Sequence, residues 1–370
     1  MPKKRVSLFQ PSEFQSAILN WYHENHRVLP WRVVGEGETD PYKVWMSEIM
    51  LQQTTVPAVV PYFLKFTERW PTIAALAGAD DAEVMAAWAG LGYYARARNL
   101  LKCARVVTQE WGGQFPQERE GLLSLPGIGP YTAAAMMAIA YGKPATVVDG
   151  NIERITARIF AIPDPYPDGK KIVHHASGHL FDGMERWKPA QIKAYPQALM
   201  DIGANICTPQ KPLCPLCPVQ EFCKAHAAGE AEKYPVKAAK KTIPVRYGEV
   251  YWIQDIEGNV IFQKRLSQRM LGGMIGLPTT DWDLTAGKKG ENALNWQRNF
   301  PELRQIGHVY HVFTHFRLEL AVWGVVVPDL RKTLTSSADL LIFNTRVVEL
   351  DKIGLPTLFL KAARLAHKVF

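Results

Sequence analysis

A glycine-rich segment with the sequence Leu125-Pro126-Gly127-Ile128-Gly129-Pro130-Tyr131-Thr132-Ala133 connects a short helical stretch to a strongly helical one. Gly127 and Gly129 permit a tight turn and a close approach of the backbone to another molecule. Pro130 suits the first turn of a helix, where its missing N–H costs little. The N–H groups at the start of the next helix then point outward with the positive end of the dipole, which predicts a backbone grip on a phosphate. A bare Gly-X-Gly before a helix is more often a packing corner, but the longer string is much more specific.

Helical periodicity surrounds this hairpin from about Pro11 to Ala228. A segment rich in Lys and Ala follows, which is typical of a linker. Beyond Arg246 the pattern changes to β-rich runs at Val250–Ile256, Asn259–Gln263 and Phe316–Val327, with helical signals near Gly290–Arg298 and Thr357–Lys368. We therefore predict a multidomain chain: an all-α domain over residues 1–228, a linker over 229–246 and an α/β domain over 247–370.

The composition is that of a folded chain of two or three domains. Of the 370 residues, 47% are hydrophobic and 21% are charged, which argues against a mostly disordered protein. No apolar run approaches the roughly 18 residues of a membrane-spanning helix, and the first residues lack the apolar core of a signal peptide. We therefore expect a soluble cytoplasmic protein with no membrane partner. Nothing in the sequence indicates obligate assembly, so we expect a monomer.

The net charge of +8 is compatible with a polyanionic partner such as nucleic acid. The excess is unevenly distributed. Residues 1–235 hold 24 Lys and Arg against 23 Asp and Glu, whereas residues 236–370 hold 19 against 12. If the chain binds DNA, its first part must do so through a local arrangement of residues and not through bulk charge.

Four of the five cysteines, Cys207, Cys214, Cys217 and Cys223, fall close together. Short loops favour chelation because their closure entropy is small, and a disulfide framework is improbable in an intracellular chain. Four thiolates fit zinc or a [4Fe–4S] cluster. Zinc modules usually show two CxxC pairs, whereas this segment has one, which favours the cluster. Lys211 lies between prolines in the first loop, where it is either a phosphate contact or an ordinary solvated residue.

Two carboxylates are candidates for acid–base chemistry. Glu48 is the only charged residue from Val44 to Leu64, so it is either a desolvated general acid with a raised pKa or a single charge on a solvated edge. Asp149 follows an apolar run and precedes Gly150, a position typical of a helix N-cap. The cap and a catalytic role are compatible, because a capping carboxylate is held rigidly, within reach of DNA that the glycine hairpin binds.

Several strings occur together and in order over nearly all of the first 225 residues: Leu29-Pro30-Trp31-Arg32, Ser47-Glu48-Ile49-Met50-Leu51-Gln52-Gln53-Thr54, Gly90-Leu91-Gly92-Tyr93-Tyr94, the glycine hairpin, Val148-Asp149-Gly150-Asn151 and the four cysteines. They closely resemble the MutY family of adenine DNA glycosylases, in the helix-hairpin-helix DNA glycosylase superfamily. The resemblance implies a six-helix barrel-like module, a second helical module that carries a [4Fe–4S] cluster, and DNA bound between them. It also implies base excision repair at the bacterial nucleoid.

The resemblance further implies the reaction. Relatives of the endonuclease III type, which also cut the strand, have Lys where this sequence has Tyr131. Lys can form a Schiff base with the opened sugar and Tyr cannot, so we predict a monofunctional glycosylase that leaves an abasic site. By resemblance Glu48 protonates adenine N7, and Asp149 stabilises the sugar cation or bonds to it transiently, with Tyr131 as a hydrogen-bonding partner. The adenine must first be flipped out of the duplex.

Further residues match family positions that contact DNA. Gln53 and Tyr93 match positions that wedge into the duplex, although Tyr93 taken alone would be interpreted as a core residue. Positions that line the adenine pocket are matched by Trp31, Arg32, Leu51 and Gln197, the last through a short string only.

The second domain resembles the Nudix-like domain that recognises 8-oxoguanine opposite the target adenine in that family. Met270–Pro278 resembles one of its loops, and the family's Phe-Ser-His loop is matched by Phe313-Thr314-His315. Thr keeps the hydroxyl, so we expect recognition to survive, but its added methyl group changes the contact. The Glu-rich metal box of Nudix hydrolases is absent, which argues against diphosphate hydrolysis.

The sequence thus predicts an enzyme that acts on double-stranded DNA containing adenine mispaired with 8-oxoguanine or guanine. A thymine mismatch glycosylase of the same fold is a second interpretation, against which the second domain counts. A non-catalytic DNA-binding or redox-sensing iron–sulfur protein is a third, and the presence of both Glu48 and Asp149 in matching strings argues against it.

Overall fold

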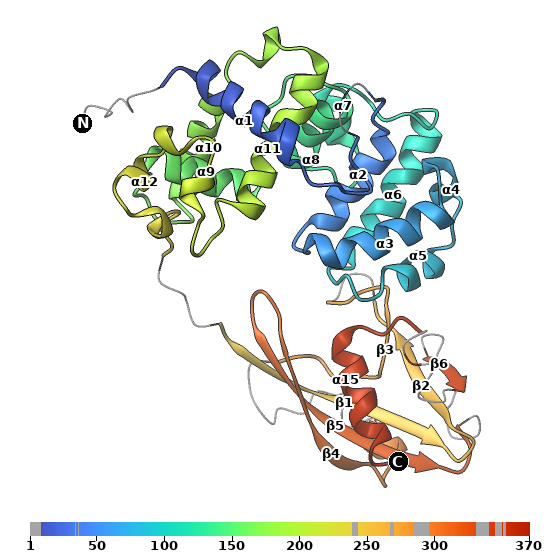
Figure 1. Ribbon diagram of the computed structural model, residues 1–370. Coiled ribbons are helices and arrows are strands. Elements are labelled where there is room, and N and C mark those ends of the chain that lie inside the picture. Colours follow the sequence, from blue (N-terminus) through green and yellow to red (C-terminus); the bar gives the residue numbers. More distant parts are fainter. Residues whose placement is uncertain are drawn as a thin grey trace. The chain divides into compact units, whose positions relative to one another are not determined.

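The computed structural model describes residues 9–33, 35, 37–238, 243–266, 270–283, 296–330, 340–344, 350 and 353–370 (Figure 1). They form two compact units. The first consists of Met1–Gly78 with Asn99–Lys240, and the second of Ala79–Arg98 with Lys241–Phe370. Residues 79–98, which the sequence analysis assigned to the helical domain, therefore belong to the second unit. None of the helices in the described ranges has the length and apolarity needed to span a lipid bilayer.

Helices build the first unit, and local signals in the sequence explain where several of them begin. The Asp40 carboxylate caps α2 (Pro41–Leu51) by accepting the Tyr42 N–H at 2.9 Å. Proline occupies the first turn of α2 and of α8 (Pro130–Ala135), as predicted for Pro130. The other helices of four or more residues are α1 (Pro11–Asn25), α3 (Val56–Arg69), α4 (Ile73–Ala77), α6 (Ala95–Glu110, whose first turn belongs to the second unit), α7 (Arg119–Ser124), π-helix η1 (Met136–Ala140), α9 (Gly150–Phe160), α10 (Gly169–Leu180), α11 (Pro189–Asn205) and α12 (Lys224–Ala227).

The core of the first unit explains how two functional segments are placed. Helix α9 buries Ile152, Ile155 and Ile159 in a cluster that also contains Leu199 and Ile202 of α11. The apolar residues recur every three or four positions, so one face of α9 is fixed against the core. Its first residue follows Asp149, and its buried face borders the loop that carries the four cysteines.

The second unit contains helix α5 (Asp81–Trp88) and a six-stranded sheet. The strands of the sheet are β1 (Val245–Asp255), β2 (Asn259–Lys264), β3 (Ile275–Gly276), β4 (Arg304–Val312), β5 (Arg317–Val327) and β6 (Leu340–Asn344). The order is β3-β2-β1-β5-β4, with β6 paired to β2. Strands β1 and β5 are parallel, and the other pairs are antiparallel. The predicted turn at Glu257-Gly258 is confirmed, because Asp255 Oδ1 accepts the N–H groups of Glu257 and Asn259 there.

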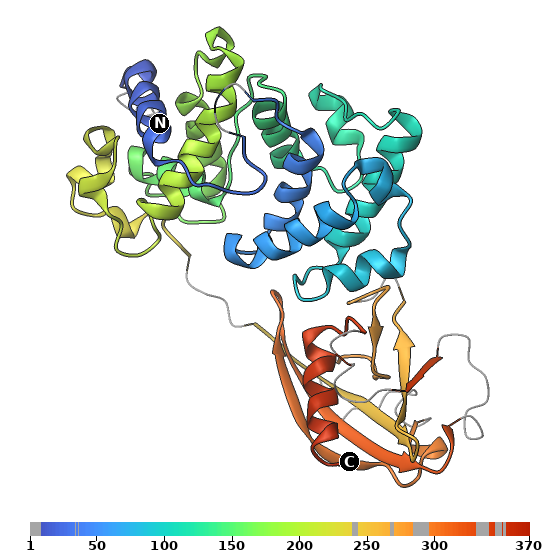
Figure 2. The same ribbon diagram turned by 45° about the vertical axis from the view of Figure 1, so that its right-hand side comes forward.

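Helix α15 (Thr357–His367) covers one face of this sheet (Figures 1 and 2). Val250 and Trp252 of β1 share one apolar cluster with α15. The alternate residues Tyr251 and Ile253 face the other side and cluster with Phe300. The α/β class is therefore confirmed. The predicted helix near Gly290–Arg298 lies mostly outside the described residues. Residues 296–299, which are described, are helical.

Candidate active site and cysteine pocket

The glycine hairpin joins α7 to α8 in the first unit. Gly127 has a φ of +79°, and a Cβ added there would lie 2.8 Å from the Asn99 Cβ, so only glycine fits without a shift. Gly129 is the N-cap residue of α8, and a Cβ added there would meet no atom within 4 Å. The start of α8 thus has open space beside it, which the predicted phosphate grip requires.

Glu48 lies in α2 and is 7% exposed. The Tyr131 hydroxyl donates a hydrogen bond to Glu48 Oε2 at 2.6 Å. Burial raises the pKa of Glu48 to about 7; the Tyr131 hydrogen bond and the Arg32 charge act to lower this pKa, and the Asp149 charge acts to raise it. A substantial fraction of Glu48 is therefore protonated at neutral pH. The alternative of a single charge on a solvated edge is wrong.

Asp149 is the N-cap of α9, as predicted. Its Oδ1 accepts the Ile152 N–H at 2.7 Å, and its Oδ2 accepts the Asn151 amide at 2.8 Å. Burial raises the pKa of Asp149, against these hydrogen bonds and the Arg154 charge, which act to lower it. The carboxylate is thus held in one orientation and is poorly hydrated, so it is suited to face a developing positive charge.

Arg32 is held by a carboxylate that sequence reasoning missed. Asp201 in α11 is fully buried and accepts two hydrogen bonds from the Arg32 guanidinium, at 2.7 and 2.8 Å. Its two oxygens also accept the Nε–H of Arg27 at 2.6 Å and the Arg27 backbone N–H at 2.9 Å. Two guanidinium groups therefore compensate one buried carboxylate, which also accepts a backbone hydrogen bond. The only hint in the sequence is a charge among apolar residues of a helix, because the partners are more than 160 positions away.

The other residues predicted to line the adenine pocket are buried or partly buried. Trp31 is 8% exposed and packs edge-on against Phe63, with ring centroids 5.2 Å apart. Gln197 is 6% exposed, and its amide nitrogen donates to the Lys193 carbonyl at 2.9 Å. Leu51 is half-buried at the end of α2. Each side chain is thus packed within the unit, and their contact with adenine stays a prediction.

The two predicted wedge residues have unusual backbones. Gln53 has a φ of +57° and Tyr93 a φ of +49°, in the left-handed region that residues other than glycine seldom adopt. Gln53 is exposed, and Tyr93 is 51% exposed. The interpretation of Tyr93 as a core residue is therefore wrong. Strained backbone at exposed side chains is frequent at functional sites.

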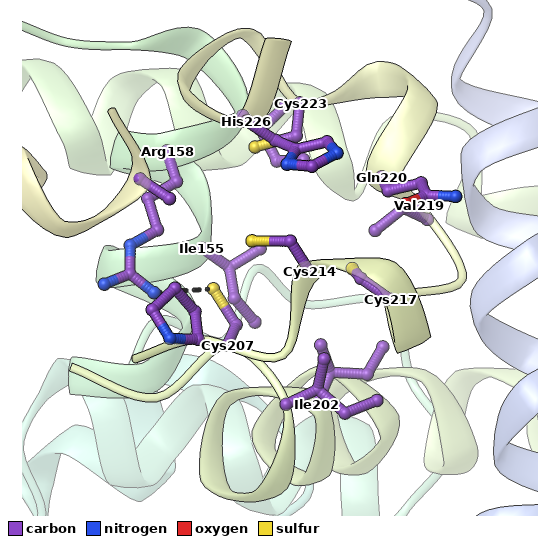
Figure 3. Close-up of a pocket in the computed structure, with 14 residues that line it drawn as sticks. Ile155, Arg158, Ile202, Cys207, Cys214, Cys217, Val219, Gln220, Cys223 and His226 are labelled. Carbon is purple, nitrogen blue, oxygen red and sulfur yellow. Dashed lines mark hydrogen bonds between the residues drawn. The ribbon is translucent and has the colours of Figure 1, made fainter. Parts of the chain in front are cut away.

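The four cysteines line one pocket beside α9 and α11 (Figure 3). The rest of its wall is mostly apolar and includes Ile155, Ile202 and Val219. No group of three or more His, Cys, Asp or Glu side chains in the described ranges is arranged to hold a single metal ion. The four thiols instead surround a cavity. This donor set and its apolar wall fit an iron–sulfur cluster.

Two arginines of α9, the buried Arg158 and the partly buried Arg154, tie the cysteine loop to this helix. Arg158 is 1% exposed and donates to Cys207 Sγ at 3.2 Å, to the Thr208 carbonyl at 2.7 Å and to the Pro209 carbonyl at 3.1 Å. Arg154 donates to the Cys207 carbonyl at 2.7 Å and to Asn151 Oδ1 at 2.8 Å. Because Asn151 also bonds to Asp149, hydrogen bonds run from the cysteine loop to the capping carboxylate. Neither arginine was predicted from the sequence as a functional residue.

Lys211 in the cysteine loop is exposed, which fits both the predicted phosphate contact and the alternative of an ordinary solvated residue. Its backbone has a φ of +47°, and its N–H donates to Glu232 Oε1 at 2.7 Å. The Glu232 carboxylate thus fixes the loop at this point, while the Lys211 side chain extends into solvent.

In the second unit, Phe313-Thr314-His315 forms the turn between β4 and β5. The Phe313 N–H donates to the Phe316 carbonyl at 2.9 Å, which closes the turn. The Phe313 ring stacks on Trp282 with centroids 5.7 Å apart, whereas Thr314 and His315 are exposed. The Tyr93 hydroxyl lies 3.4 Å from Thr314 Oγ1. A predicted wedge and a predicted lesion-reading residue therefore lie together.

Family models match both units. Residues 46–179 match the HhH-GPD superfamily of base excision DNA repair proteins, residues 207–223 match the iron–sulfur binding domain of endonuclease III, and residues 249–365 match the NUDIX domain. Together with the hairpin, the buried carboxylates and the cysteine pocket, they define a helix-hairpin-helix DNA glycosylase with an iron–sulfur module and a Nudix-like domain.

Individual relatives narrow this class. The chain is 33% identical to the adenine DNA glycosylase of Homo sapiens, over 85% of this chain and 67% of the relative. It is 35% identical to that of Buchnera aphidicola subsp. Acyrthosiphon pisum, over 83% of this chain and 85% of the relative. A solved thermostable thymine-DNA glycosylase is 30% identical over 59% of this chain and 97% of its own, with a TM-score of 0.49. The chain belongs to the adenine DNA glycosylase family.

Proposed function

We propose that this enzyme removes adenine mispaired with 8-oxoguanine or guanine from double-stranded DNA, as a monofunctional glycosylase. The observation that carries the proposal is the buried Glu48 carboxyl, hydrogen-bonded to Tyr131 and close enough to Asp149 for that charge to raise its pKa. Cleavage of a glycosidic bond needs an acid that protonates the leaving group and a carboxylate that stabilises the sugar cation, and two carboxyl groups of this kind supply both. Family membership supplies adenine as the base.

Glu48 acts as the general acid. Its carboxyl proton passes to adenine N7, and the electron pair of the bond between C1′ and N9 leaves with the base. A pKa of about 7 is near the working pH of most proteins, where a group can both hold and release a proton. Tyr131 orients the carboxyl through the hydrogen bond at 2.6 Å.

Asp149 stabilises the sugar cation that forms as the base leaves. Its two hydrogen bonds satisfy part of the carboxylate and leave the negative charge in a poorly hydrated place. Such a charge is worth more than the same charge in water. Water then adds at C1′, which yields an abasic sugar and free adenine, and the proton that it releases restores the acid.

The absence of a lysine at the hairpin position argues for a single activity. Tyr131 donates to Glu48 and has a pKa raised well above its ordinary value by burial and by the Glu48 and Asp149 charges. A neutral phenol does not form a Schiff base with the sugar. The strand therefore stays intact after the base has left.

Arg32 and the second unit define the substrate. Asp201 holds the Arg32 guanidinium beside Glu48, where its charge acts on the Glu48 pKa. We assign the reading of 8-oxoguanine to Phe313, Thr314 and His315, with Tyr93 as the wedge. The exposed hydroxyl and imidazole at this turn offer donors and acceptors to a base edge.

Cys207, Cys214, Cys217 and Cys223 would hold the iron–sulfur cluster, which we propose to be [4Fe–4S]. When bound, it crosslinks the loop and supplies rigidity that four free thiols lack. Burial raises the pKa of the Cys217 thiol to about 12, so ligation to iron is what makes this sulfur a thiolate at neutral pH. Arg158 and Arg154 hold the same loop from the protein side.

A single-turnover assay tests the proposal. Duplexes with adenine opposite 8-oxoguanine, adenine opposite guanine and thymine opposite guanine are each incubated with excess protein, and the free base and strand breaks are measured. We expect free adenine from the first two duplexes, faster from the first, with no break before alkali treatment. Release of thymine only would support the thymine glycosylase, and release of no base would support the non-catalytic alternative.

A further inference from the structure

A basic groove lies between β4, at one edge of the sheet in the second unit, and helix α15. It is lined by His308, Val309, Tyr310, Lys361, Arg364, Leu365 and Lys368. Three of these residues are Lys or Arg, one is His and none is acidic. We call this site the basic groove.

The packing of α15 fixes where its charges lie. Lys361, Arg364 and Lys368 recur at intervals of three and four, so they share one side of the helix. All three are exposed, whereas Phe359 and Ala362 are fully buried against the sheet. The positive side of α15 is therefore held in place by the burial of the opposite side, and its position does not depend on a mobile loop.

Strand β4 adds an aromatic ring and further positive charge. Tyr310 is 52% exposed, the Arg317 guanidinium lies 5.7 Å from the Tyr310 ring centroid, and Lys361 Nζ donates to the Tyr310 carbonyl at 3.1 Å. Glu319 pairs with Arg317 at 2.7 Å and neutralises that one cation. Burial and the Lys361 charge lower the pKa of the adjacent His311. The remaining cations still outnumber the acids here.

Strand β4 connects the groove to the turn that we assign to lesion reading. Strand β4 ends at Val312, and Phe313 follows directly. Tyr310 lies three residues before Phe313, which corresponds to about 10 Å along a strand. Because each DNA strand carries a phosphate about every 3.4 Å of the helix axis, a duplex read at Phe313 has several phosphates within the reach of β4 and α15.

We propose that the basic groove binds the phosphate backbone of the duplex beside the mispair. This inference rests on the proposed function for its placement at the lesion. The contact is electrostatic and independent of base sequence, because flexible Lys and Arg heads meet phosphates and no base edge. It gives Lys361, Arg364 and Lys368, three of the cations in residues 236–370, a definite role.

The test compares two double variants with equal changes of charge. Arg364→Gln with Lys368→Gln removes two cations from the groove. Lys264→Gln with Arg298→Gln removes two exposed cations elsewhere in the second unit.

The dissociation constant of full-length protein is measured at several salt concentrations, for an undamaged duplex and for a duplex with adenine opposite 8-oxoguanine. The slope of the logarithm of the association constant against log salt concentration is negative, and the groove variant is expected to reduce its magnitude by about two. Binding at 0.1 M salt should weaken roughly tenfold or more. The control variant leaves both unchanged.

Equal slopes in the two variants and the parent would overturn the proposal. So would an equal loss in both variants, because the effect would then reflect net charge alone. If the groove variant keeps its DNA affinity but loses capture by an acidic peptide, the groove serves a protein partner instead. Absence of excision in the parent would count against the proposed function only, since the salt dependence on undamaged duplex is measured independently.

Discussion

The carboxyl site in the first unit and the β4–β5 turn in the second unit are built in opposite ways. Glu48 and Asp201 are almost or completely buried, and hydrogen bonds hold each carboxyl group. Thr314 and His315 are exposed on a tight turn. The difference follows from the two tasks. Proton transfer and cation stabilisation require groups removed from water, whereas reading a base requires donors and acceptors that another molecule can reach. Substitutions in the first region should therefore cost rate or stability, and those in the second should cost discrimination.

The largest effect is expected from Asp149→Asn. Asparagine caps helices as well as aspartate does, so α9 should form, but the negative charge opposite the sugar cation is lost. The single-turnover rate should fall by about 10²–10³-fold or more, while the dissociation constant for the mispaired duplex changes little. The control is Asp168→Asn, at the start of α10, where the exposed side chain makes no capping hydrogen bond. Equal rates in Asp149→Asn and the parent would refute the assigned role.

Asp201→Asn should affect stability first. It leaves two guanidinium groups beside a neutral amide, and breaking a buried ion pair typically costs about 3–5 kcal/mol. We expect a free energy of unfolding lower by about 3 kcal/mol or more in urea titrations. Glu118→Gln is the matched control, because its pair with Lys143 is exposed and is expected to contribute less than about 1 kcal/mol. A similar small loss in both variants would contradict the role of Asp201.

Phe313→Ala should sharpen the contrast, because it removes a ring that stacks on Trp282 at the recognition turn. An aromatic contact of this kind is worth about 0.5–1.5 kcal/mol. Without this ring, the turn that presents Thr314 and His315 to the base loses an anchor of that free energy. The preference for adenine opposite 8-oxoguanine over adenine opposite guanine should therefore fall by about 3–10-fold, measured as the ratio of single-turnover rates. Val312→Ala, on an exposed neighbour, should leave the ratio unchanged. If the rates on both duplexes fall equally, Phe313 serves folding and not recognition.

Tyr131→Phe gives the smallest and most specific effect. In the parent, the hydrogen bond from Tyr131 acts to lower the pKa of Glu48. Loss of this bond in the variant should therefore raise that pKa. The alkaline limb of the rate profile, where the acid becomes deprotonated, is then expected at higher pH than in the parent. A limb at an unchanged or lower pH would show that the hydroxyl does not act on Glu48. Tyr141→Phe is the control, since its hydroxyl donates to the Phe115 carbonyl and not to Glu48.

Local sequence predicted the features that depend on neighbouring residues. Each of three such features depends on a few consecutive residues and was found where predicted: the hairpin glycines, the Asp149 cap and the β1–β2 turn. Asp201 and Arg158 were missed because their partners lie far away in the chain, at Arg27 and Arg32 and at Thr208 and Pro209. Tyr93 could not be placed from its residue type, since a tyrosine in an apolar string fits a core as well as a surface. Tyr93 is 51% exposed on a left-handed backbone, and the string reveals neither feature.

The buried acid Glu48 is central to the proposed mechanism, and the dependence of the rate of adenine release on pH tests its role. The duplex carries adenine opposite 8-oxoguanine, and the parent and Glu48→Gln are measured under single-turnover conditions from pH 5 to 9 by the free adenine formed. Because the pKa of Glu48 is raised from 4.5 to about 7, the acid form is present below this pH and is lost above it. We predict a level rate below about pH 7, a fall approaching tenfold per pH unit well above it, and no measurable release by Glu48→Gln. A parent rate that stays level to pH 9, or adenine release by Glu48→Gln at the parent rate, would contradict the account.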